Sequence, residues 1–277
     1  MPMRSLLIIA SAALFCERST AQVAPLPSAE PGVLAVTYRL SSQPDSTSPF
    51  TRTEMMRLVV GKTLSKFESI GQSKMDSLTT AARQAASTQA NMQLIGDRFM
   101  ALPKSGSKYK IYKQAASGRV YCFDQIGMAL YRYDERQPLF TWTITPTMRQ
   151  VAGYACQRAT TTFAGRQYEA WFTREVPIAE GPYKFYGLPG LIVKVEDVRN
   201  QYIFELTQLA RISEPEQISL PEGRVTATTK KQFVQGRREY ELTLLDKISA
   251  KGHAVSEQDR REYMQKLKSR NNPLELQ

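Results

Sequence analysis

The order in which strand-like and helical segments follow one another constrains the fold of this chain most strongly. Runs rich in β-branched and aromatic residues lie at residues 33–40, 55–60 and 62–67, and again between residues 108 and 206. Helical spacing of apolar residues is confined to residues 73–95 and to the region after residue 230. Because strands and helices are segregated rather than alternating, the pattern argues against a βαβ fold. It predicts an α+β fold, with a curved antiparallel β-sheet or incomplete barrel packed against a few helices.

Turn signals place two hairpins within this order. Ala164-Gly165 predicts a hairpin whose arms are residues 157–162 and 167–173. A second hairpin is expected between residues 191–196 and 201–206. Both lie in the middle of the chain, so we expect the sheet to be built largely from strands that are neighbours in sequence.

Capping boxes mark the starts of two predicted helices. Ser73 and Asp76 form one box and predict a helix over residues 73–95. Ser256 and Asp259 form the other, which opens a basic helix that ends near residue 268. In each box the serine caps the first turn while the acidic side chain reaches back to it.

Residues 1–21 have the layout of a cleavable secretory signal. A short basic region is followed by an apolar run at residues 6–15, and small residues precede a boundary after Ala21. The run is about half of the roughly 20 residues that a membrane-spanning helix needs. We therefore expect an exported chain, periplasmic or associated with the outer membrane, without a transmembrane span in its mature part. Lipid attachment at Cys16 is the alternative, although Phe15 stands where a lipidation signal has a small residue.

The rest of the chain divides into three regions. Residues 22–31 hold three prolines and predict an extended leader, and residues 32–210 predict a β-rich domain. Residues 211–277 predict a basic helical region packed on that domain. Loss of residues 1–21 removes two arginines and one glutamate, which lowers the formal net charge from +11 to +10. Residues 224–270 supply +6 of this charge, from 12 Lys and Arg against 6 Asp and Glu.

Two cysteines remain once the secretory signal, residues 1–21, is removed. Cys122 and Cys156 both lie in strand-like neighbourhoods. In an oxidising compartment an even number of cysteines suggests a disulfide, and two cysteines allow a single intramolecular pairing. We therefore expect a bond between them. The alternative is a pair of buried free thiols that pack as small apolar groups.

Few residues are suited to catalysis or metal binding, so no enzyme is predicted. One His and three Cys cannot fill a multi-zinc site, and a Ser-His-Asp hydrolase would depend on His253, which we expect in an exposed loop. No phosphate-binding glycine pattern follows a strand, so no cofactor is expected. Five carboxylates could supply an acid–base pair: Glu169, Glu175, Glu180, Glu196 and Asp197. Their spacing is not diagnostic, and charged strand surfaces are the simpler interpretation.

Residues 187–192 read Gly-Leu-Pro-Gly-Leu-Ile and carry the most specific local signal. Pro189 presets φ and Gly190 accepts a positive φ, which predicts a type II turn. Aromatic residues precede the turn, and Tyr and Trp suit binding surfaces because they offer large areas at low entropic cost. The partner-binding candidates are Trp171, Tyr183, Phe185, Tyr186, Leu188 and Pro189. Core packing and turn formation are the alternative roles for these residues.

The same six residues resemble the name motif of the GLPGLI family, secreted proteins typical of Bacteroidota. Linked motifs accompany it in order: Trp142, Gly153-Tyr154-x-Cys156, Gly165-Arg166-x-Tyr168-x-Ala170-Trp171-Phe172-Thr173 and Val176-Pro177-Ile178. The likeness is dense from residue 142 to residue 197 and looser before it. The resemblance implies export, a β-rich body and no established reaction. It also suggests an association with outer-membrane TonB-dependent transporters, beside whose genes this family is often found.

Three functions are compatible with these features. The first is a non-enzymatic cell-envelope protein that binds an envelope or outer-membrane protein, with strand addition at a sheet edge as the binding mode. The alternative is a periplasmic carrier or chaperone that holds an apolar ligand inside the curved sheet, which requires a large apolar cavity. A second alternative is a carboxylate-dependent hydrolase, which requires two acids in one cleft.

The basic C-terminal region adds one further class of partner. Its charge is suited to an acidic lipid or glycan surface, or to an acidic protein. Nucleic acid is not expected, because the region lacks interleaved aromatic residues and the chain carries an export signal.

Overall fold

The computed structural model describes residues 26–84, 89–102, 105–214 and 216–276. The predicted signal, its cleavage point and Cys16 lie outside these ranges. The end of the proline-rich leader is packed rather than merely extended, because Glu30–Pro31 form a short strand, β1. The Glu30 carboxylate accepts hydrogen bonds from the main-chain N–H groups of Thr63 and Leu64 at 2.8 and 2.9 Å. Glu30 therefore ties the leader to a turn of the sheet.

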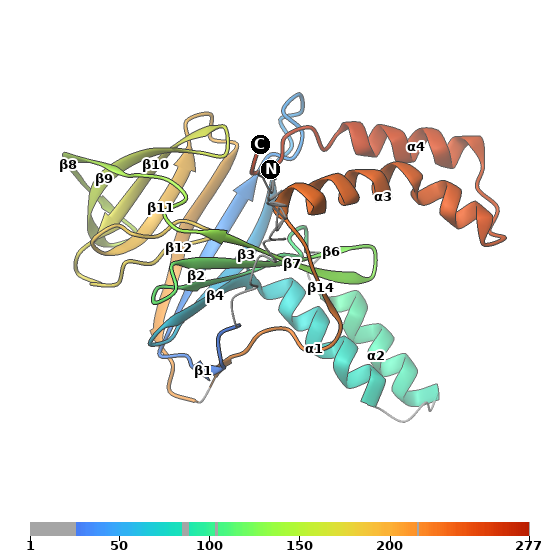
Figure 1. The fold of residues 1–277 in the computed structure, drawn as a ribbon, viewed down its shortest axis with the longest axis horizontal. Coiled ribbons are helices and arrows are strands. Elements are labelled where there is room, and N and C mark those ends of the chain that lie inside the picture. The colour runs from blue at the N-terminus through green and yellow to red at the C-terminus, as the bar shows by residue number, and fades with distance from the viewer. Residues whose placement is uncertain (1–25, 85–88, 103–104, 215, 277) are drawn as a thin grey trace, which may run out of the picture.

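One 12-stranded sheet makes up most of the protein (Figure 1). Its strands in chain order are β2 (Leu34–Ser42), β3 (Arg52–Val60), β4 (Leu64–Ser69), β5 (Lys110–Gln114), β6 (Arg119–Ile126), β7 (Ala129–Arg136), β8 (Thr143–Val151), β9 (Tyr154–Phe163), β10 (Arg166–Thr173), β11 (Leu191–Asp197), β12 (Tyr202–Arg211) and β14 (Val225–Ala227). Their order across the sheet is β14-β7-β6-β5-β4-β3-β2-β12-β11-β10-β9-β8. A two-stranded sheet joins β1 to β13 (Gln217–Ile218).

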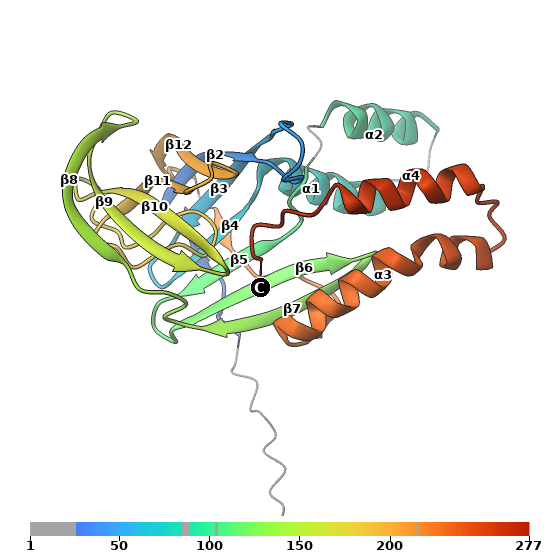
Figure 2. The ribbon, with the colours of Figure 1, turned by 90° about the horizontal axis from the view of Figure 1, so that it is seen from above.

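Pairing in the large sheet is antiparallel except between β14 and β7. The sheet is strongly curved, and its two edges, β14 and β8, do not pair with each other (Figure 2). The predicted α+β fold with a curved, incomplete barrel is therefore confirmed.

Both predicted hairpins are present. Ala164 and Gly165 have φ values of 47° and 79°, as a tight primed turn requires, and Phe163 pairs with Arg166 across it. In the second hairpin, β11 and β12 pair as neighbours. Local turn chemistry thus specified these two connections.

The helix predicted over residues 73–95 is wrong in its boundaries. The structure has α1 (Ile70–Gln84) and α2 (Gln89–Ala101). Ser69, the last residue of β4, accepts a hydrogen bond from the Gln72 N–H at 3.1 Å and so caps α1. Ser73 lies inside the helix because the strand passes directly into it. The predicted end at residue 95 lies inside α2, which continues to Ala101.

The C-terminal helices are α3 (Lys230–Ala250) and α4 (Glu257–Lys268). The predicted capping box of Ser256 and Asp259 is confirmed, and Thr229 forms another with Gln232 before α3. Phe233 is the buried residue of α3, with its ring 5.4 Å from that of Tyr133 on β7. Among the helices that the structure describes, none is both long and apolar enough to cross a membrane.

The disulfide expected between Cys122 and Cys156 is not formed in the structure. Both cysteines are free and buried, so the alternative of two packed thiols holds. Cys122 lies on β6 and Cys156 on β9, which are eight places apart in the sheet order. Burial raises the pKa of the Cys122 thiol to about 12 and that of Cys156 to about 11. Both thiols are therefore protonated and unreactive at neutral pH.

Candidate functional site

The connection between β10 and β11, residues 174–190 and here called the strap, lies inside the curve of the sheet. Phe185 at its centre is fully buried, with its ring 4.8 Å from that of Tyr168 on β10. Tyr183 stacks on Phe204 of β12 at 6.4 Å. The concave side of the sheet is thus filled by the chain's own aromatic side chains, where the carrier hypothesis expects an apolar ligand.

The turn of the motif differs from the predicted type II turn. A type II turn would bond the N–H of Leu191 to the carbonyl of Leu188, but the Leu191 N–H donates to Val176 at 3.0 Å. The Gly190 N–H donates to the Leu188 carbonyl instead, at 2.8 Å. A Cβ atom on Gly190 would lie 2.0 Å from the carbonyl oxygen of Thr173. Close approach to β10 is therefore the reason for glycine at this position.

The six partner-binding candidates do not share an exposed surface. Four are buried, Tyr186 is half-buried and Pro189 is exposed; the buried ones are Trp171, Tyr183, Phe185 and Leu188. The Tyr186 carbonyl accepts a hydrogen bond from Trp142 Nε1 at 2.8 Å. The Arg149 guanidinium covers Trp171, 3.9 Å from its ring centroid. Apart from Pro189, these side chains occupy packing positions, the alternative that the sequence left open.

A buried lysine on β5 holds one part of the strap. Lys113 is 2% exposed, and its Nζ lies 2.6 Å from Glu180 Oε2 and 2.6 Å from the carbonyl oxygen of Gly181. Ser65 of β4 donates to the other Glu180 oxygen at 2.9 Å. Burial lowers the pKa of Lys113, and the Glu180 charge offsets that shift only in part. Contacts from β4 and β5 on one side and from β10 and β12 on the other show that the sheet curls around the strap.

A second buried lysine, Lys184, belongs to the strap itself. Its Nζ contacts Glu135 of β7 and lies 2.7 Å from Glu275 Oε1. Lys230, at the start of α3, contacts the same two carboxylates at 3.1 and 2.5 Å. The Tyr183 hydroxyl also donates to Glu275, at 2.6 Å. Two lysines and two glutamates thus form a quartet, with Lys184 fully buried and the other three partly buried, that joins the strap, β7, α3 and the C-terminal residues.

The charges of the quartet stabilise one another. Burial acts to lower the pKa of Lys184, yet the surrounding acidic groups, first Cys122 and Tyr133 and then the Glu275 and Glu135 carboxylates, raise that pKa well above the usual range. Burial likewise acts to raise the pKa of Glu275, but Lys184 and Lys230 hold it below its ordinary value. Both groups are therefore ionised at neutral pH.

The C-terminal segment, residues 271–276, is held by a second cluster beside the quartet. Arg166 of β10, 5% exposed, donates to the main-chain oxygens of Pro273 and Leu274 at 2.7 and 3.2 Å. Its Nη1 also lies 3.1 Å from Asp197. Arg166 of the sheet therefore binds main-chain oxygens of the segment that follows α4.

None of the four quartet residues was identified from the sequence as a site, and in the cluster Asp197 was considered only as one of five carboxylates for hydrolysis. Lys184 offered one local signal, since it is a charged residue between Tyr183 and Phe185 within a motif. Glu275 offered none, because nothing near it in sequence indicates a buried partner. These residues come together only through the three-dimensional arrangement of β7, β10, the strap and α3.

The carboxylates considered for hydrolysis are each engaged by a cation or a hydrogen-bond donor. Glu169 and Glu196 are opposite each other in the register of β10 and β11. Each is engaged by a cation: Glu169 by Arg158 at 2.6 Å and Glu196 by Lys194 at 2.7 Å. Burial acts to raise the pKa of Glu169, but hydrogen bonds from Arg158 and Trp171 hold it below its ordinary value. Because a general acid needs a raised pKa, this pair is suited to sheet stability rather than to proton transfer.

The other three acids have separate partners. Glu175 accepts from the Ala155 N–H at 2.9 Å, Glu180 pairs with Lys113, and Asp197 pairs with Arg166. Within the described ranges, no group of three His, Cys, Asp or Glu side chains could hold a metal ion.

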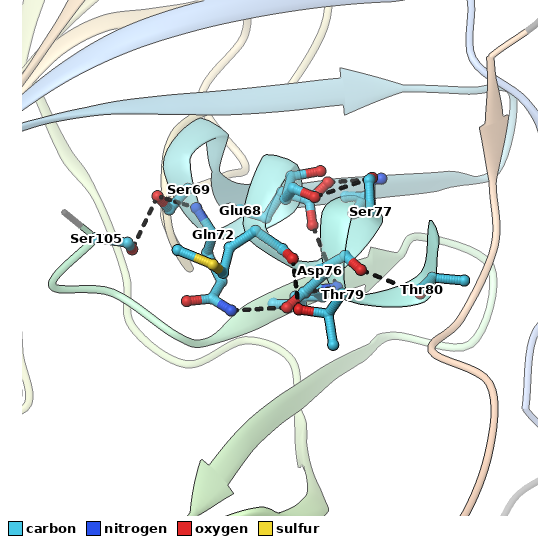
Figure 3. A network of polar contacts seen from close by, with 12 residues as sticks. Glu68, Ser69, Gln72, Asp76, Ser77, Thr79, Thr80 and Ser105 are labelled. Atoms are coloured by element: carbon cyan, nitrogen blue, oxygen red, sulfur yellow. Dashed lines mark hydrogen bonds and ion pairs between the residues drawn. The ribbon is translucent and has the colours of Figure 1, made fainter. Parts of the chain in front are cut away.

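A polar network fixes the start of α1 on the sheet (Figure 3). Lys110 of β5 lies 2.7 Å from Asp76 and 3.7 Å from Glu68. Gln72 donates to the same Asp76 carboxylate at 2.7 Å. Ser105 donates to Ser69, the cap of the helix, at 3.1 Å. The polar groups of the network hydrogen-bond or pair with one another, and together they orient α1.

An open pocket of about 290 Å³ adjoins this network. It is lined by Thr53, Glu54, Met55, Ile70, Gly71, Lys74 and Ser105. The Glu54 carboxylate is already satisfied, because Ser105 and Ser107 donate to it at 2.6 and 2.9 Å. The pocket lies at the lower end of the size range of small-molecule sites.

The two C-terminal helices, residues 230–268 and here called the arm, project away from the sheet (Figures 1 and 2). The exposed cations of the arm are Lys231, Arg238, Lys247, Lys251, Arg261, Lys266 and Lys268. Three large apolar side chains are exposed beside them: Val234, Leu242 and Met264. His253 lies exposed between the two helices, as expected.

The exposed cations and apolar residues alternate along single helix faces. On α3, Lys231, Val234, Arg238 and Leu242 recur at spacings of three and four and share one face. On α4, Arg261, Met264 and Lys268 do the same. This pattern is suited to contact with a negatively charged surface that also offers apolar groups.

A family model matches the part of the chain around the strap. Residues 162–194 match a family model described as "Protein of unknown function (Porph_ging)". This stretch contains β10, the strap and the start of β11. No curated protein matches the chain.

The fold resembles that of solved structures. Two are described as "Structure of PNGF-II in P21 space group" and "Structure of PNGF-II in C2 space group", with TM-scores of 0.52 and 0.51. Each is 11% identical to this chain and covers 76% of it. The match spans only 34% and 33% of those proteins, about a third of their length. At this identity the likeness concerns the fold alone.

Proposed function

We propose that this chain is an exported, non-enzymatic binding module of the cell envelope that engages an acidic partner protein through its arm. In this proposal the secretory signal, residues 1–21, is removed after Ala21 and the mature chain acts in the periplasm or at the outer membrane. A TonB-dependent transporter of the outer membrane is the partner that the GLPGLI resemblance suggests. The buried strap then serves as scaffold rather than as the binding surface.

The observation that carries this proposal is the combination of charge and exposure on the arm. The region from residue 224 to residue 270 holds +6 of net charge, and the arm within it is packed on the sheet mainly at its first turns, around Phe233. Its basic and apolar side chains remain accessible along both helices. Interfaces favour apolar anchors surrounded by charges that steer association.

The arm is also held in a fixed shape, which supports a binding role. Arg260 of α4 pairs with Asp246 of α3 at 2.7 Å, and the Tyr263 hydroxyl donates to the Glu241 carbonyl at 2.9 Å. At the base, Lys230 is anchored in the quartet by Glu135 and Glu275. A rigid surface loses less conformational entropy on binding than a mobile one.

Strand addition, the mode expected from the sequence, is less well supported. The edge strand β8 contains Pro146, which has no N–H to donate, and its pairing shifts register between Ile144 and Met148. Prolines and irregular pairing are features that protect sheet edges from added strands. The arm is therefore the preferred surface.

A co-purification experiment with matched charge variants tests the proposal. The tagged full chain is compared with an arm variant, Arg238→Glu with Arg261→Glu and Lys268→Glu, in envelope fractions of a producing bacterium. The control reverses three exposed cations away from the arm, Lys62→Glu with Arg199→Glu and Arg211→Glu. We expect the wild type and the control to retain one outer-membrane protein, and the arm variant to lose it in a salt-dependent manner.

Two results would contradict this proposal. Equal retention by the arm variant and the control would exclude the arm as the surface, and a preparation containing only the bait would argue against a stable protein partner. In parallel, binding of the wild type and the arm variant to vesicles containing anionic lipid is measured, to test whether a lipid surface is the partner. Binding to vesicles that depends on the arm, without a retained protein, would replace the protein partner by a lipid surface.

A further inference from the structure

We propose that the groove holding residues 271–276 is a binding site for extended acidic peptides, and that the chain's own segment occupies it as an exchangeable ligand. This inference is independent of the partner proposed for the arm. It rests on the way the segment is bound, which resembles peptide recognition more than core packing.

The main chain of the segment is recognised by side chains of the sheet. Arg166 donates to the main-chain oxygens of Pro273 and Leu274. The Tyr202 hydroxyl donates to the carbonyl of Asn272 at 2.6 Å. The Tyr168 hydroxyl donates to that of Leu274 at 3.2 Å. Such contacts accept any sequence, because they involve groups that every peptide has.

Near both ends of the segment, its main-chain N–H groups donate to main-chain carbonyls of neighbouring residues. The Asn272 N–H donates to the Pro44 carbonyl at 3.0 Å, and the Leu276 N–H donates to the Ala164 carbonyl at 2.9 Å. The segment forms neither helix nor strand. The segment is therefore held by individual hydrogen bonds of its main chain and is not paired as a strand of the sheet.

Selectivity arises from three side chains that enter the groove. Asn272 is 4% exposed and donates to the Gln43 carbonyl at 2.6 Å. Leu274 packs against the main core, and Glu275 is a carboxylate of the quartet. Pro273 and Leu276 are exposed and add little discrimination. The site therefore requires an acidic residue at the position of Glu275, with an apolar residue before it.

The groups that bind the segment have further partners outside it. Arg166 is oriented by Asp197 and by Gln201, the latter at 3.0 Å. Lys184 and Lys230 are both in contact with Glu135. If the segment leaves, two lysines remain around one carboxylate, which creates an excess positive charge at the Glu275 position. A preorganised, positively charged seat of this kind favours binding of another carboxylate.

A nicked form of the full chain tests the exchange. A protease site is inserted after Ser269, in the exposed link that follows α4, and the protein is cleaved without removing any part. A fluorescent peptide with the sequence of residues 270–276 is then added, and its binding is followed by anisotropy. We expect the peptide to replace the resident segment, and the same peptide with Glu275→Gln to bind about tenfold to a hundredfold more weakly. A peptide with Pro273→Ala is the matched control and should bind as the parent does.

Failure of the labelled peptide to exchange, or equal binding by the Glu275→Gln peptide, would overturn the proposal. Hydrogen–deuterium exchange on the uncut chain keeps it testable if nicking unfolds the protein. We expect residues 271–276 to exchange faster than the strands of the sheet, and excess peptide to change this rate. Exchange of the segment only together with the whole sheet would show that it is an integral part of the core, which would also overturn the proposal.

Discussion

Lys113 and Lys184 are both buried lysines that hold the strap, yet the groups around them differ. Lys113 faces a single carboxylate, Glu180, together with main-chain carbonyls, and burial lowers its pKa. Lys184 faces two carboxylates, Glu135 and Glu275, which act together with Cys122 and Tyr133 to overcome the same effect of burial and raise its pKa. Both lysines are almost fully buried, so the groups around each one, rather than the depth of burial, decide how firmly it keeps its proton.

The two sites also differ in what they connect. The Lys113 site joins the strap only to β4 and β5, within the sheet. The Lys184 site brings in α3 through Lys230 and the C-terminal segment through Glu275. We therefore regard the first as a local anchor and the second as the junction of the molecule.

Removal of the Lys184 charge should have the largest effect. Lys184→Met leaves two partly buried carboxylates with Lys230 alone, and we expect a loss of about 3–5 kcal/mol in the free energy of unfolding. Urea denaturation followed by circular dichroism measures it. Lys62→Met, at an exposed turn, is the control and should change stability little. A loss for Lys184→Met no greater than that for Lys113→Met would remove the distinction between the two sites.

A substitution in the strap backbone tests whether the close approach of the strap to β10 stabilises the protein. Gly190→Ala would bring a Cβ atom to 2.0 Å from the Thr173 carbonyl oxygen, whereas a Cβ atom on Gly187 would meet nothing within 4 Å. We expect Gly190→Ala to destabilise the protein by about 3 kcal/mol and Gly187→Ala, with its positive φ, by about 1–2 kcal/mol. Thermal denaturation compares the pair. Equal losses would mean that the close approach to β10 is unimportant.

These sites also show what the sequence could predict. The turn at Ala164-Gly165 and the capping box of Ser256 were predictable because a few adjacent residues determine each. The start of α1 was missed because Ser69 ends a strand and at the same time caps the helix that follows. The role of Gly190 was misread because it depends on Thr173 of the preceding strand, which approaches only in the folded protein.

The buried charges lay beyond prediction for the same reason. Lys184 and Glu275 are far apart in sequence, and neither has a local pattern that names the other. The fold class, in contrast, follows from the order of strands and helices alone. Local chemistry thus determined the elements, while the sites depend on contacts between distant segments.

Substitution of the other lysine should have a smaller effect. Lys113→Met removes one ion pair and the donor to the Gly181 carbonyl, and we expect a loss of about 1–3 kcal/mol. The reason for the smaller value is that Lys113→Met leaves one carboxylate without its cation, and Glu180 keeps the hydrogen bond from Ser65, whereas Lys184→Met affects both Glu135 and Glu275. Urea denaturation under the same conditions measures it. A loss equal to that of Lys184→Met would contradict the ranking.

The smallest effect concerns pH. The pKa of Glu275 is lowered in the folded state, so its contribution to stability is present above the ordinary value near 4.5 and is lost as the pH falls through the lowered pKa. Wild type should therefore exceed Glu275→Gln in stability at neutral pH, and the difference should shrink below pH 4.5. Unfolding free energies measured from neutral to acidic pH test this. Glu239→Gln, an exposed change on the arm, should give no such convergence.

A double-mutant cycle between Lys184→Met and Glu275→Gln tests most directly the claim that the quartet joins the strap to the C-terminal segment. Residues in direct contact couple, so the cycle should give an interaction energy of about 1–3 kcal/mol, while the cycle between Lys113→Met and Glu275→Gln should be additive within about 0.5 kcal/mol. Additive losses in both cycles would contradict the claim and would leave the strap and the segment as independent parts of the fold.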